Sequence, residues 1–184
     1  ETGTGKSALV GALFPNPDQS VLIDCASLQD TADDRAYIQT VLQQSHFASD
    51  FAQDTALVFD NLDEMPDFAQ RALRSVLETF EANGDAARPR TLIVGTTRTP
   101  LRDAVQSGRF RDDLYYLLAG ASITVPPLRL RERPVVLAKT LVDQIAGHAV
   151  DITADAEDAI TSYAWPGNVR ELRNALQQAL LHGD

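Results

Sequence analysis

The chain opens on a glycine-rich run that ends in lysine and serine, Glu1-Thr2-Gly3-Thr4-Gly5-Lys6-Ser7, and an apolar, helix-compatible segment follows at once over residues 8–14. Small residues let successive backbone N–H groups turn inward around phosphate oxygens, and the N-terminus of the following helix adds its positive dipole end. In the pattern G-x-x-x-x-G-K-[ST], the lysine reaches the β- and γ-phosphates and the hydroxyl binds Mg²⁺. We therefore predict a nucleotide-binding phosphate loop with these roles for Lys6 and Ser7. The first glycine of the pattern is expected one position before Glu1.

Composition is that of an ordinary globular protein of one domain or of a core with a small appendage, with 184 residues of which 44% are apolar. The single cysteine, Cys25, follows an apolar run and is expected in the core. The three histidines are scattered without metal-ligand spacing, so no zinc site is predicted. No apolar run approaches the roughly 20 residues that span a bilayer, and no signal peptide is visible. A cytoplasmic location without a membrane partner is therefore expected.

Charge is distributed unevenly along the chain. Residues 1–70 carry 2 basic and 12 acidic side chains, which accounts for the whole net charge of −10, while residues 71–184 carry 14 of each sign. A domain with this balance has no general basic face for a phosphate backbone. Direct DNA binding by this segment is not expected.

Short apolar runs alternate with helical patterns in the first two thirds of the chain, which is typical of a parallel sheet with crossover helices. Strands are expected at 21–23, 56–59, 92–95 and 123–125, and helices at about 33–46, 67–82 and 100–107. A further strand is expected upstream of the loop. After Pro126-Pro127 only helical patterns follow, at about 132–147, 153–164 and 168–182. We predict an α/β core over residues 1–127 and a small all-helical lid over residues 128–184.

An apolar strand that ends in a carboxylate, Ala56-Leu57-Val58-Phe59-Asp60, follows the loop at a plausible distance. In phosphate-loop proteins this arrangement brings an aspartate beside the Mg²⁺ that the loop hydroxyl holds. Asp60 is therefore the second predicted metal ligand.

Five stretches, in order along nearly the whole chain, carry a family resemblance. They are Glu1-Thr2-Gly3-Thr4-Gly5-Lys6-Ser7, Cys25-Ala26-Ser27-Leu28, Gly108-Arg109-Phe110-Arg111-Asp112-Asp113-Leu114-Tyr115-Tyr116, Pro126-Pro127-Leu128-Arg129, and Tyr163-Ala164-Trp165-Pro166-Gly167-Asn168-Val169-Arg170-Glu171-Leu172. With them the chain resembles the central AAA+ domain of bacterial enhancer-binding transcription activators, the sigma-54 interaction domain. The resemblance implies an AAA+ P-loop NTPase that binds ATP with Mg²⁺, forms a ring of six or seven copies and acts on RNA polymerase holoenzyme.

Two arginines receive roles from the resemblance. Arg111 matches an arginine finger that projects into the neighbouring subunit's site, where a guanidinium neutralises charge on the γ-phosphate. Arg170 matches the sensor arginine of the lid, which contacts nucleotide in its own subunit. The alternatives are a surface ion pair of Arg111 with Asp112 or Asp113, and capping or pairing by Arg170 near the start of the last helix.

The strand end departs from the family pattern. The family has Asp-Glu there, and the glutamate polarises the attacking water; this chain has Asp60 and Asn61. An amide orients water but does not accept its proton, so general-base help is lost at that position. The family also has asparagine just before the matched cysteine, where this chain has Asp24. We hypothesise that Asp24 pairs with Asn61 and partly replaces the missing carboxylate.

Three other departures concern the partner and the sensors. The family's second finger arginine is Leu117, and the polar sensor after the third strand is Arg98, or Thr97 with a one-residue shift. The Gly-Ala-Phe-Thr-Gly-Ala loop that grips sigma-54 is absent, since no glycine lies between Cys25 and Asp60. Residues 33–47 favour an ordinary helix there. Remodelling of the sigma-54 polymerase is therefore not expected.

Three functions remain open at the level of sequence. The first is an ATP-binding regulatory module that works by nucleotide-dependent assembly, with slow or absent hydrolysis. The second is a working AAA+ motor that uses Asp24 or another carboxylate. The third, a phosphate-loop kinase for a small molecule, is disfavoured because the chain offers arginines suited to a subunit interface and no evident acceptor pocket.

Overall fold

A computed structural model describes residues 1–16, 20–47, 55–83 and 91–182. The chain divides into two compact units. The sheet unit is Ser7–Ser122, and the lid unit combines Glu1–Lys6 with Ile123–Asp184. Among the described residues, no helix is long and apolar enough to cross a membrane.

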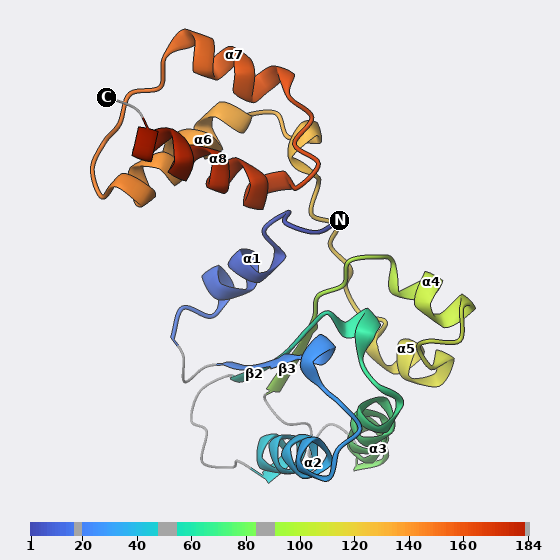
Figure 1. Cartoon of the computed structure of the whole chain (residues 1–184). Helices are drawn as coiled ribbons and strands as arrows, with labels where there is room; N and C mark the ends of the chain where they lie inside the picture. The colour runs from blue at the N-terminus through green and yellow to red at the C-terminus, as the bar shows by residue number, and fades with distance from the viewer. Residues whose placement is uncertain (17–19, 48–54, 84–90, 183–184) are drawn as a thin grey trace. The chain divides into compact units, whose positions relative to one another are not determined.

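The sheet unit is built on three parallel strands, β1 (Ser20–Asp24), β2 (Thr55–Asp60) and β3 (Thr91–Gly95), in the order β1-β2-β3 (Figure 1). The predicted strands at 21–23, 56–59 and 92–95 are confirmed, each extended by one or two residues. In the register, Asp24 lies opposite Asp60. The carboxyl ends of β1 and β2 therefore meet at one edge, and both end in a carboxylate.

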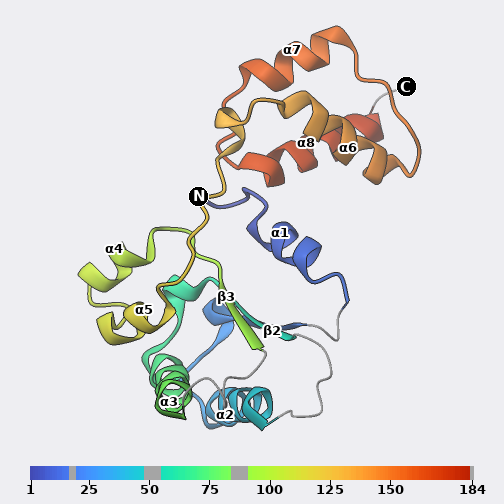
Figure 2. The ribbon, with the colours of Figure 1, turned by 180° about the vertical axis from the view of Figure 1, so that it is seen from behind.

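Helices cover both faces of this sheet. The helix α1 (Lys6–Leu13) lies on one face, and α2 (Ala32–Phe47) and α3 (Asp67–Asn83) lie on the other (Figures 1 and 2). Side chains alternate between the faces of a strand, so Ile23, Leu57 and Phe59 enter the core with α2 and α3. Leu22 and Val58 lie on the α1 side of the sheet, where they line a hollow with residues of α1.

Connecting segments complete the sheet unit. They are the 3₁₀ turns η2 (Cys25–Ser27) and η3 (Leu62–Glu64) and the helices α4 (Leu101–Gln106) and α5 (Asp112–Leu118). The predicted helices at 33–46, 67–82 and 100–107 are confirmed. The helix α5 was not among the predicted elements; it has only seven residues, and its Leu114 is fully buried in the core.

The predicted strand at 123–125 is wrong. Residues 119–127 form neither helix nor strand, and Ile123 is 81% exposed. A strand needs a neighbour that accepts and donates hydrogen bonds, and no ladder partner for this segment lies within the described ranges. Pro126 and Pro127 also lack the N–H groups that a ladder would use.

The lid unit carries three helices, α6 (Pro134–Ala146), α7 (Ala154–Ser162) and α8 (Asn168–His182), and the turn η5 (Leu128–Leu130) (Figure 2). Local signals set their ends, since Pro134 begins α6, Gly147 ends it at φ 75°, and Thr153 caps α7. The helices bury a separate core made of Leu128, Ala138, Leu141, Ile160, Trp165 and Leu172. The predicted all-helical lid is confirmed.

Replacing Leu73 of α3 tests the core of the sheet unit. Leu73 is 1% exposed among the side chains between α3 and the sheet. We expect Leu73→Ala to lower the free energy of unfolding by about 2–5 kcal/mol, because it removes buried apolar contacts and leaves a cavity. Leu13→Ala is the matched control, since Leu13 is 62% exposed at the end of α1. Urea unfolding measures both, and equal losses would contradict the assigned core.

Candidate functional site

The glycine-rich run is held by backbone conformations that favour glycine. Gly3 and Gly5 have φ of 73° and 95°, in the left-handed region. A side chain at Gly3 would collide with the carbonyl of Gly167, and its Cβ would lie 3.3 Å from the Cβ of Arg170. The Gly3 carbonyl accepts a hydrogen bond from the N–H of Val169 at 2.9 Å. Within the lid unit, the Cβ of the predicted sensor Arg170 therefore lies next to the glycine-rich loop.

Polar side chains of the lid unit grip the first loop residues. Arg129 contacts the Glu1 carboxylate with two nitrogens, at 2.9 and 2.5 Å. The fully buried Asn168 donates to Glu1 Oε2 at 3.1 Å and to the Thr2 carbonyl at 3.0 Å, and accepts from the Leu128 N–H at 2.8 Å. These donors, Arg129 before Asn168, lower the pKa of Glu1 to about 2.

The remaining loop contacts involve Arg131, Thr4 and Lys6. Arg131 donates to the Thr4 carbonyl at 2.5 Å, and Thr4 is 2% exposed. The Lys6 ammonium donates to the Glu1 carbonyl at 2.6 Å and lies 3.5 Å from Thr4 Oγ1. The loop thus has a defined shape, and its lysine lies over its own backbone.

A second group of predicted site residues, the strand-end site, lies in the sheet unit. Ser7 Oγ lies 3.4 Å from Asp60 Oδ2, and the Thr96 hydroxyl donates to Asp60 Oδ1. The N–H of Asn61 donates to Thr96 Oγ1 at 3.3 Å. A hollow of about 120 Å³ opens here, lined by Ser7, Val10, Gly11, Ser20, Leu22, Val58, Asp60 and Thr96. A hydroxyl and a carboxylate this close are hard oxygen donors that suit Mg²⁺, which takes few protein ligands and fills its other positions with water and phosphate oxygens.

Thr96 is a site residue that the sequence analysis missed. Thr97 and Arg98 are the predicted polar groups after the third strand, but Thr96, 7% exposed, is the residue that reaches Asp60. The signal was available, since Thr96 directly follows the last residue of β3. Arg98 contributes differently, because its Nε donates to Asn61 Oδ1 at 3.0 Å.

Asp24 and Asn61 lie within hydrogen-bonding distance. Asn61 Nδ2 donates to Asp24 Oδ1 at 2.9 Å, and Asp24 also accepts from the Ala26 N–H at 3.1 Å. Asn61 has φ of 56°, a left-handed conformation that asparagine tolerates better than most residues. Arg98 on its other side also forms an ion pair with Glu64 at 2.9 Å. The Asn61 amide is therefore fixed in orientation between a carboxylate and a guanidinium.

Arg111 and Leu117 both lie in the segment that ends in α5. Arg111 forms a two-nitrogen ion pair with Asp113, at 3.0 and 2.8 Å, and its third nitrogen lies 3.9 Å from Asp67. The pair with Asp113 raises the pKa of the Arg111 guanidinium and lowers that of the Asp113 carboxyl. One of the two ion-pair alternatives from the sequence analysis is thus the contact observed within this chain.

Cys25 is fully buried at the end of β1, as expected. Burial, reinforced by nearby carboxylates, raises the pKa of its thiol to about 12, so it stays protonated near neutrality. In the described ranges, no three His, Cys, Asp or Glu side chains gather in a way that could hold a metal ion.

The fold and these two groups of residues define an AAA+ phosphate-loop protein with a helical lid. Family models agree: the sigma-54 interaction domain matches residues 1–124, and an AAA+ ATPase lid domain matches residues 134–184. The chain belongs to the sigma-54 interaction domain family.

Individual relatives and solved structures support the assignment. The acetoin catabolism regulatory protein of Cupriavidus necator is 32% identical over 203 residues, covering 97% of this chain and 30% of its own length. The Nif-specific regulatory protein of Klebsiella pneumoniae is 31% identical over 198 residues, covering 97% and 38%. NtrX from Brucella abortus in complex with ATP matches the whole chain with a TM-score of 0.73 and 25% identity, over 46% of its length. This chain therefore spans less than half the length of each.

The ion pair of Arg129 with Glu1 should make the stability of the protein depend on pH. Because the folded pKa of Glu1 lies below its ordinary value, the contact stabilises the protein fully above about pH 4.5 and is lost as pH falls through about 2. We expect Arg129→Met to raise the pKa of Glu1 toward 4.5, measured by NMR titration of its carboxyl carbon. Arg133→Met is the control, and a Glu1 pKa equal in both variants would contradict the assigned cause.

Proposed function

We propose that this chain is the ATP-binding AAA+ module of a bacterial transcription regulator and works through nucleotide-dependent assembly. The single observation that carries the proposal is the loop held in shape by Arg129, Arg131 and Asn168. Its glycines adopt positive φ, and such a loop followed by a helix binds phosphates through its N–H groups. We place the boundary of the nucleotide-binding core at residue 127 and the lid at 128–184.

Each site residue has a proposed role. The loop residues Thr2, Gly3, Thr4 and Gly5 surround the phosphates with N–H groups, and Lys6 reaches the β- and γ-phosphates. Ser7 and Asp60 hold Mg²⁺, which would neutralise phosphate charge. Their separation of 3.4 Å supports this, as does the hold of Thr96 on the other oxygen of Asp60. Arg170 contacts nucleotide bound in its own subunit.

Assembly places Arg111 in a neighbouring site. We propose a ring of six or seven copies in which the Arg111 guanidinium meets the γ-phosphate bound by the next copy. Its ion pair with Asp113 must then be exchanged for the phosphate, and a side chain that is one-third exposed can make that exchange. The rest of the site offers no second finger, because Leu117 stands at that position.

RNA polymerase holoenzyme is the proposed partner, in the cytoplasm, without direct contact of this segment with DNA or membrane. An alignment of 203 positions against 184 residues means that the Cupriavidus relative carries residues without a counterpart here. A shortened segment is consistent with the absent Gly-Ala-Phe-Thr-Gly-Ala loop. We therefore propose that this module acts through assembly rather than by remodelling the sigma-54 polymerase.

Hydrolysis is expected to be slow, because Asn61 cannot take a proton from water. A working motor is the second candidate, and the Asp24–Asn61 contact favours it. Among the described residues, both hydrogen bonds that the Asp24 carboxylate accepts fall on Oδ1. The second oxygen can then accept a proton from a water that Asn61 orients. A small-molecule kinase is the remote alternative, since no observation here indicates an acceptor site.

ATP binding and turnover, measured against protein concentration, test the proposal. We expect Mg-ATP binding that Lys6→Ala weakens by about tenfold or more, because one charge-assisted contact to phosphate is lost. Association of the chains should require ATP and should fail in Arg111→Ala. Lys139→Ala is the matched control, since it removes the only other lysine, far along the sequence in α6.

The motor would be favoured by ATP turnover that rises more than linearly with protein concentration and that is abolished by Lys6→Ala and by Arg111→Ala. Tight ATP binding without turnover would favour the regulatory module. Turnover proportional to concentration and insensitive to Arg111→Ala would support the kinase and contradict both.

The proposed role of Asp24 has its own test in single-turnover ATP hydrolysis. Asp24→Asn keeps an acceptor for Asn61 but removes the carboxylate, so we expect at least about a tenfold loss of any measurable hydrolysis. ATP affinity should change little. Asp33→Asn, which removes a carboxylate at an exposed position in the first turn of α2, is the matched control. Unchanged hydrolysis in Asp24→Asn would show that Asp24 does not replace the missing glutamate.

A further inference from the structure

Gln70 is a buried polar side chain in α3, 2% exposed, that neither the sequence analysis nor the proposed site uses. Its amide makes three hydrogen bonds to backbone groups. Nε2 donates to the Met65 carbonyl at 2.7 Å and to the Arg109 carbonyl at 2.9 Å, and Oε1 accepts from the Arg111 N–H at 2.9 Å. Both donors of the amide are used, so its orientation is determined by the contacts.

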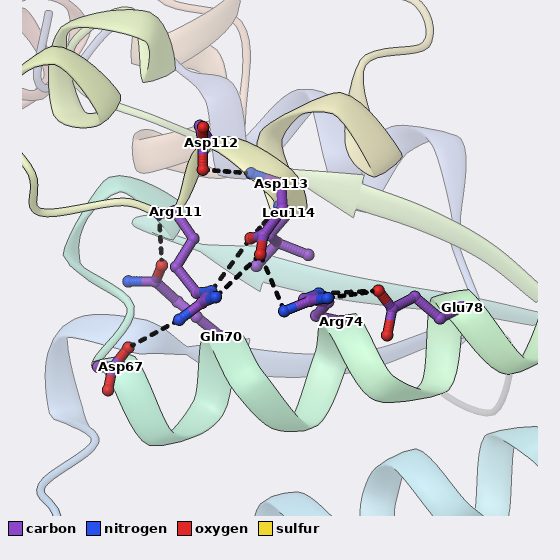
Figure 3. Close-up of polar contacts among 8 residues, drawn as sticks. All are labelled: Asp67, Gln70, Arg74, Glu78, Arg111, Asp112, Asp113 and Leu114. Atoms are coloured by element: carbon purple, nitrogen blue, oxygen red, sulfur yellow. Dashed lines mark hydrogen bonds and ion pairs between the residues drawn. The ribbon is translucent and has the colours of Figure 1, made fainter.

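One end of this bridge holds the Arg111 segment. Two of the three hydrogen bonds fall on residues 109 and 111, on either side of Phe110, which is 3% exposed in the core. Figure 3 shows Gln70 below the Arg111 backbone while the guanidinium turns to Asp113. Gln70 therefore holds the Arg111 backbone and Asp113 holds its guanidinium, and of these two partners only Gln70 is buried.

The other end of the bridge reaches the strand-end site within one short turn. Met65 directly follows η3, and its N–H donates to the Leu62 carbonyl at 3.1 Å. The N–H of Glu64 donates to the Asn61 carbonyl at 2.8 Å. The turn η3 therefore connects the Asn61 backbone to the residue whose carbonyl Gln70 binds.

Arg74, one turn after Gln70 in α3, contacts Asp113, the carboxylate that binds the Arg111 guanidinium. It lies 2.9 Å from Asp113 Oδ2 and also pairs with Glu78 at 2.7 Å (Figure 3). Asp113 is therefore shared between Arg74 and Arg111. When Arg111 turns away to another partner, Asp113 retains a cation, which makes that release less unfavourable.

We propose that Gln70 is a positioning residue that ties the Arg111 segment to the end of β2, so that the state of the strand-end site in one copy sets the position of the arginine offered to the next. The inference rests on the proposed function of Arg111 in a neighbouring site. It adds a route within one chain from its own nucleotide site to its neighbour's. The route passes through one amide and not through the guanidinium contacts.

Gln70→Met tests the bridge, since methionine fills a similar volume without hydrogen bonding. We expect hydrogen exchange at the Arg111 amide to rise about tenfold, the effect of one lost hydrogen bond. The protein concentration at half-maximal ATP-dependent association should rise by a similar factor. ATP affinity of the dilute, unassociated chain should stay unchanged, because no loop residue is altered. A general loss of structure would instead weaken both ATP-dependent association and ATP binding by the dilute chain.

Gln70→Glu separates the contact to the Arg111 N–H from the contacts to the Met65 and Arg109 carbonyls. An ionised glutamate keeps an acceptor for the Arg111 N–H and has no donor for either carbonyl. Exchange at the Arg111 amide should therefore rise less than in Gln70→Met, while association weakens. Gln39→Met, at an exposed position of α2, is the matched control.

The failures of the two proposals are distinguishable. Unchanged Arg111 exchange in Gln70→Met overturns the bridge, and so does unchanged association when Arg111→Ala abolishes it. Association that survives Arg111→Ala overturns the role of Arg111, and the inference falls with it.

Discussion

The parallel pairing of β1 with β2 is the constraint on which the strand-end site depends. Its register sets Asp24 opposite Asp60, so residue 61 continues past the edge beside Asp24. The contact of Asn61 with Asp24 at 2.9 Å follows from that register and from the left-handed turn at Asn61. A slip of β1 by one residue against β2 would move Asp24 to the opposite face of the sheet and away from Asp60. The core side chains of the same strands prevent the slip, because they would be exposed by it.

The lid unit solves a different physical problem, which is to hold a glycine-rich loop that packs few side chains of its own. Glycine loses more backbone entropy on ordering than any other residue, so such a loop needs external contacts. Asn168 supplies them through buried hydrogen bonds to the loop backbone and to η5, while Arg129 adds a charge pair at the surface. The buried amide contributes more to loop shape, because an exposed ion pair is screened by solvent and a buried unpaired amide is costly.

Much of this architecture follows from patterns in the sequence. The phosphate loop, three of four strands and the lid helices rest on local signals, namely glycine spacing, apolar runs and helical periodicity. The segment 123–125 has the same apolar signal but lacks a ladder partner, and pairing is a property of neighbours that one segment does not carry. The short helix α5 depends on the burial of Leu114, which is likewise set by the core around it.

Site residues could be predicted where their position next to a motif or a strand end identifies them. Residues whose role depends on contacts between distant segments could not. Asp60 and Asn61 stand out at a strand end, and the pairing of Asp24 with Asn61 could be inferred from an exchange of residue types. Thr96 directly follows a strand, but so do Thr97 and Arg98 within two residues, and position alone does not choose among them. Gln70 carries no such signal, because it lies within a helix and glutamine is a common residue there. The roles of Thr96 and Gln70 appear only when β3 and α3 bring them against Asp60 and Arg111.

The exchange of amide and carboxylate between positions 24 and 61 preserves the hydrogen bond but moves the charge. A carboxylate at 61 would face the Arg98 guanidinium, which lies 3.0 Å from the present amide oxygen, and would form a strong ion pair there. Such a pair lowers the pKa of a carboxyl group and makes it a poorer base. With asparagine at position 61, Arg98 donates to a neutral amide oxygen and forms its ion pair with Glu64. The carboxylate is instead that of Asp24, which accepts from the other side of the Asn61 amide. Arg98 and Asn61 are therefore matched: an arginine in contact with residue 61 is better suited to an amide there than to a general base.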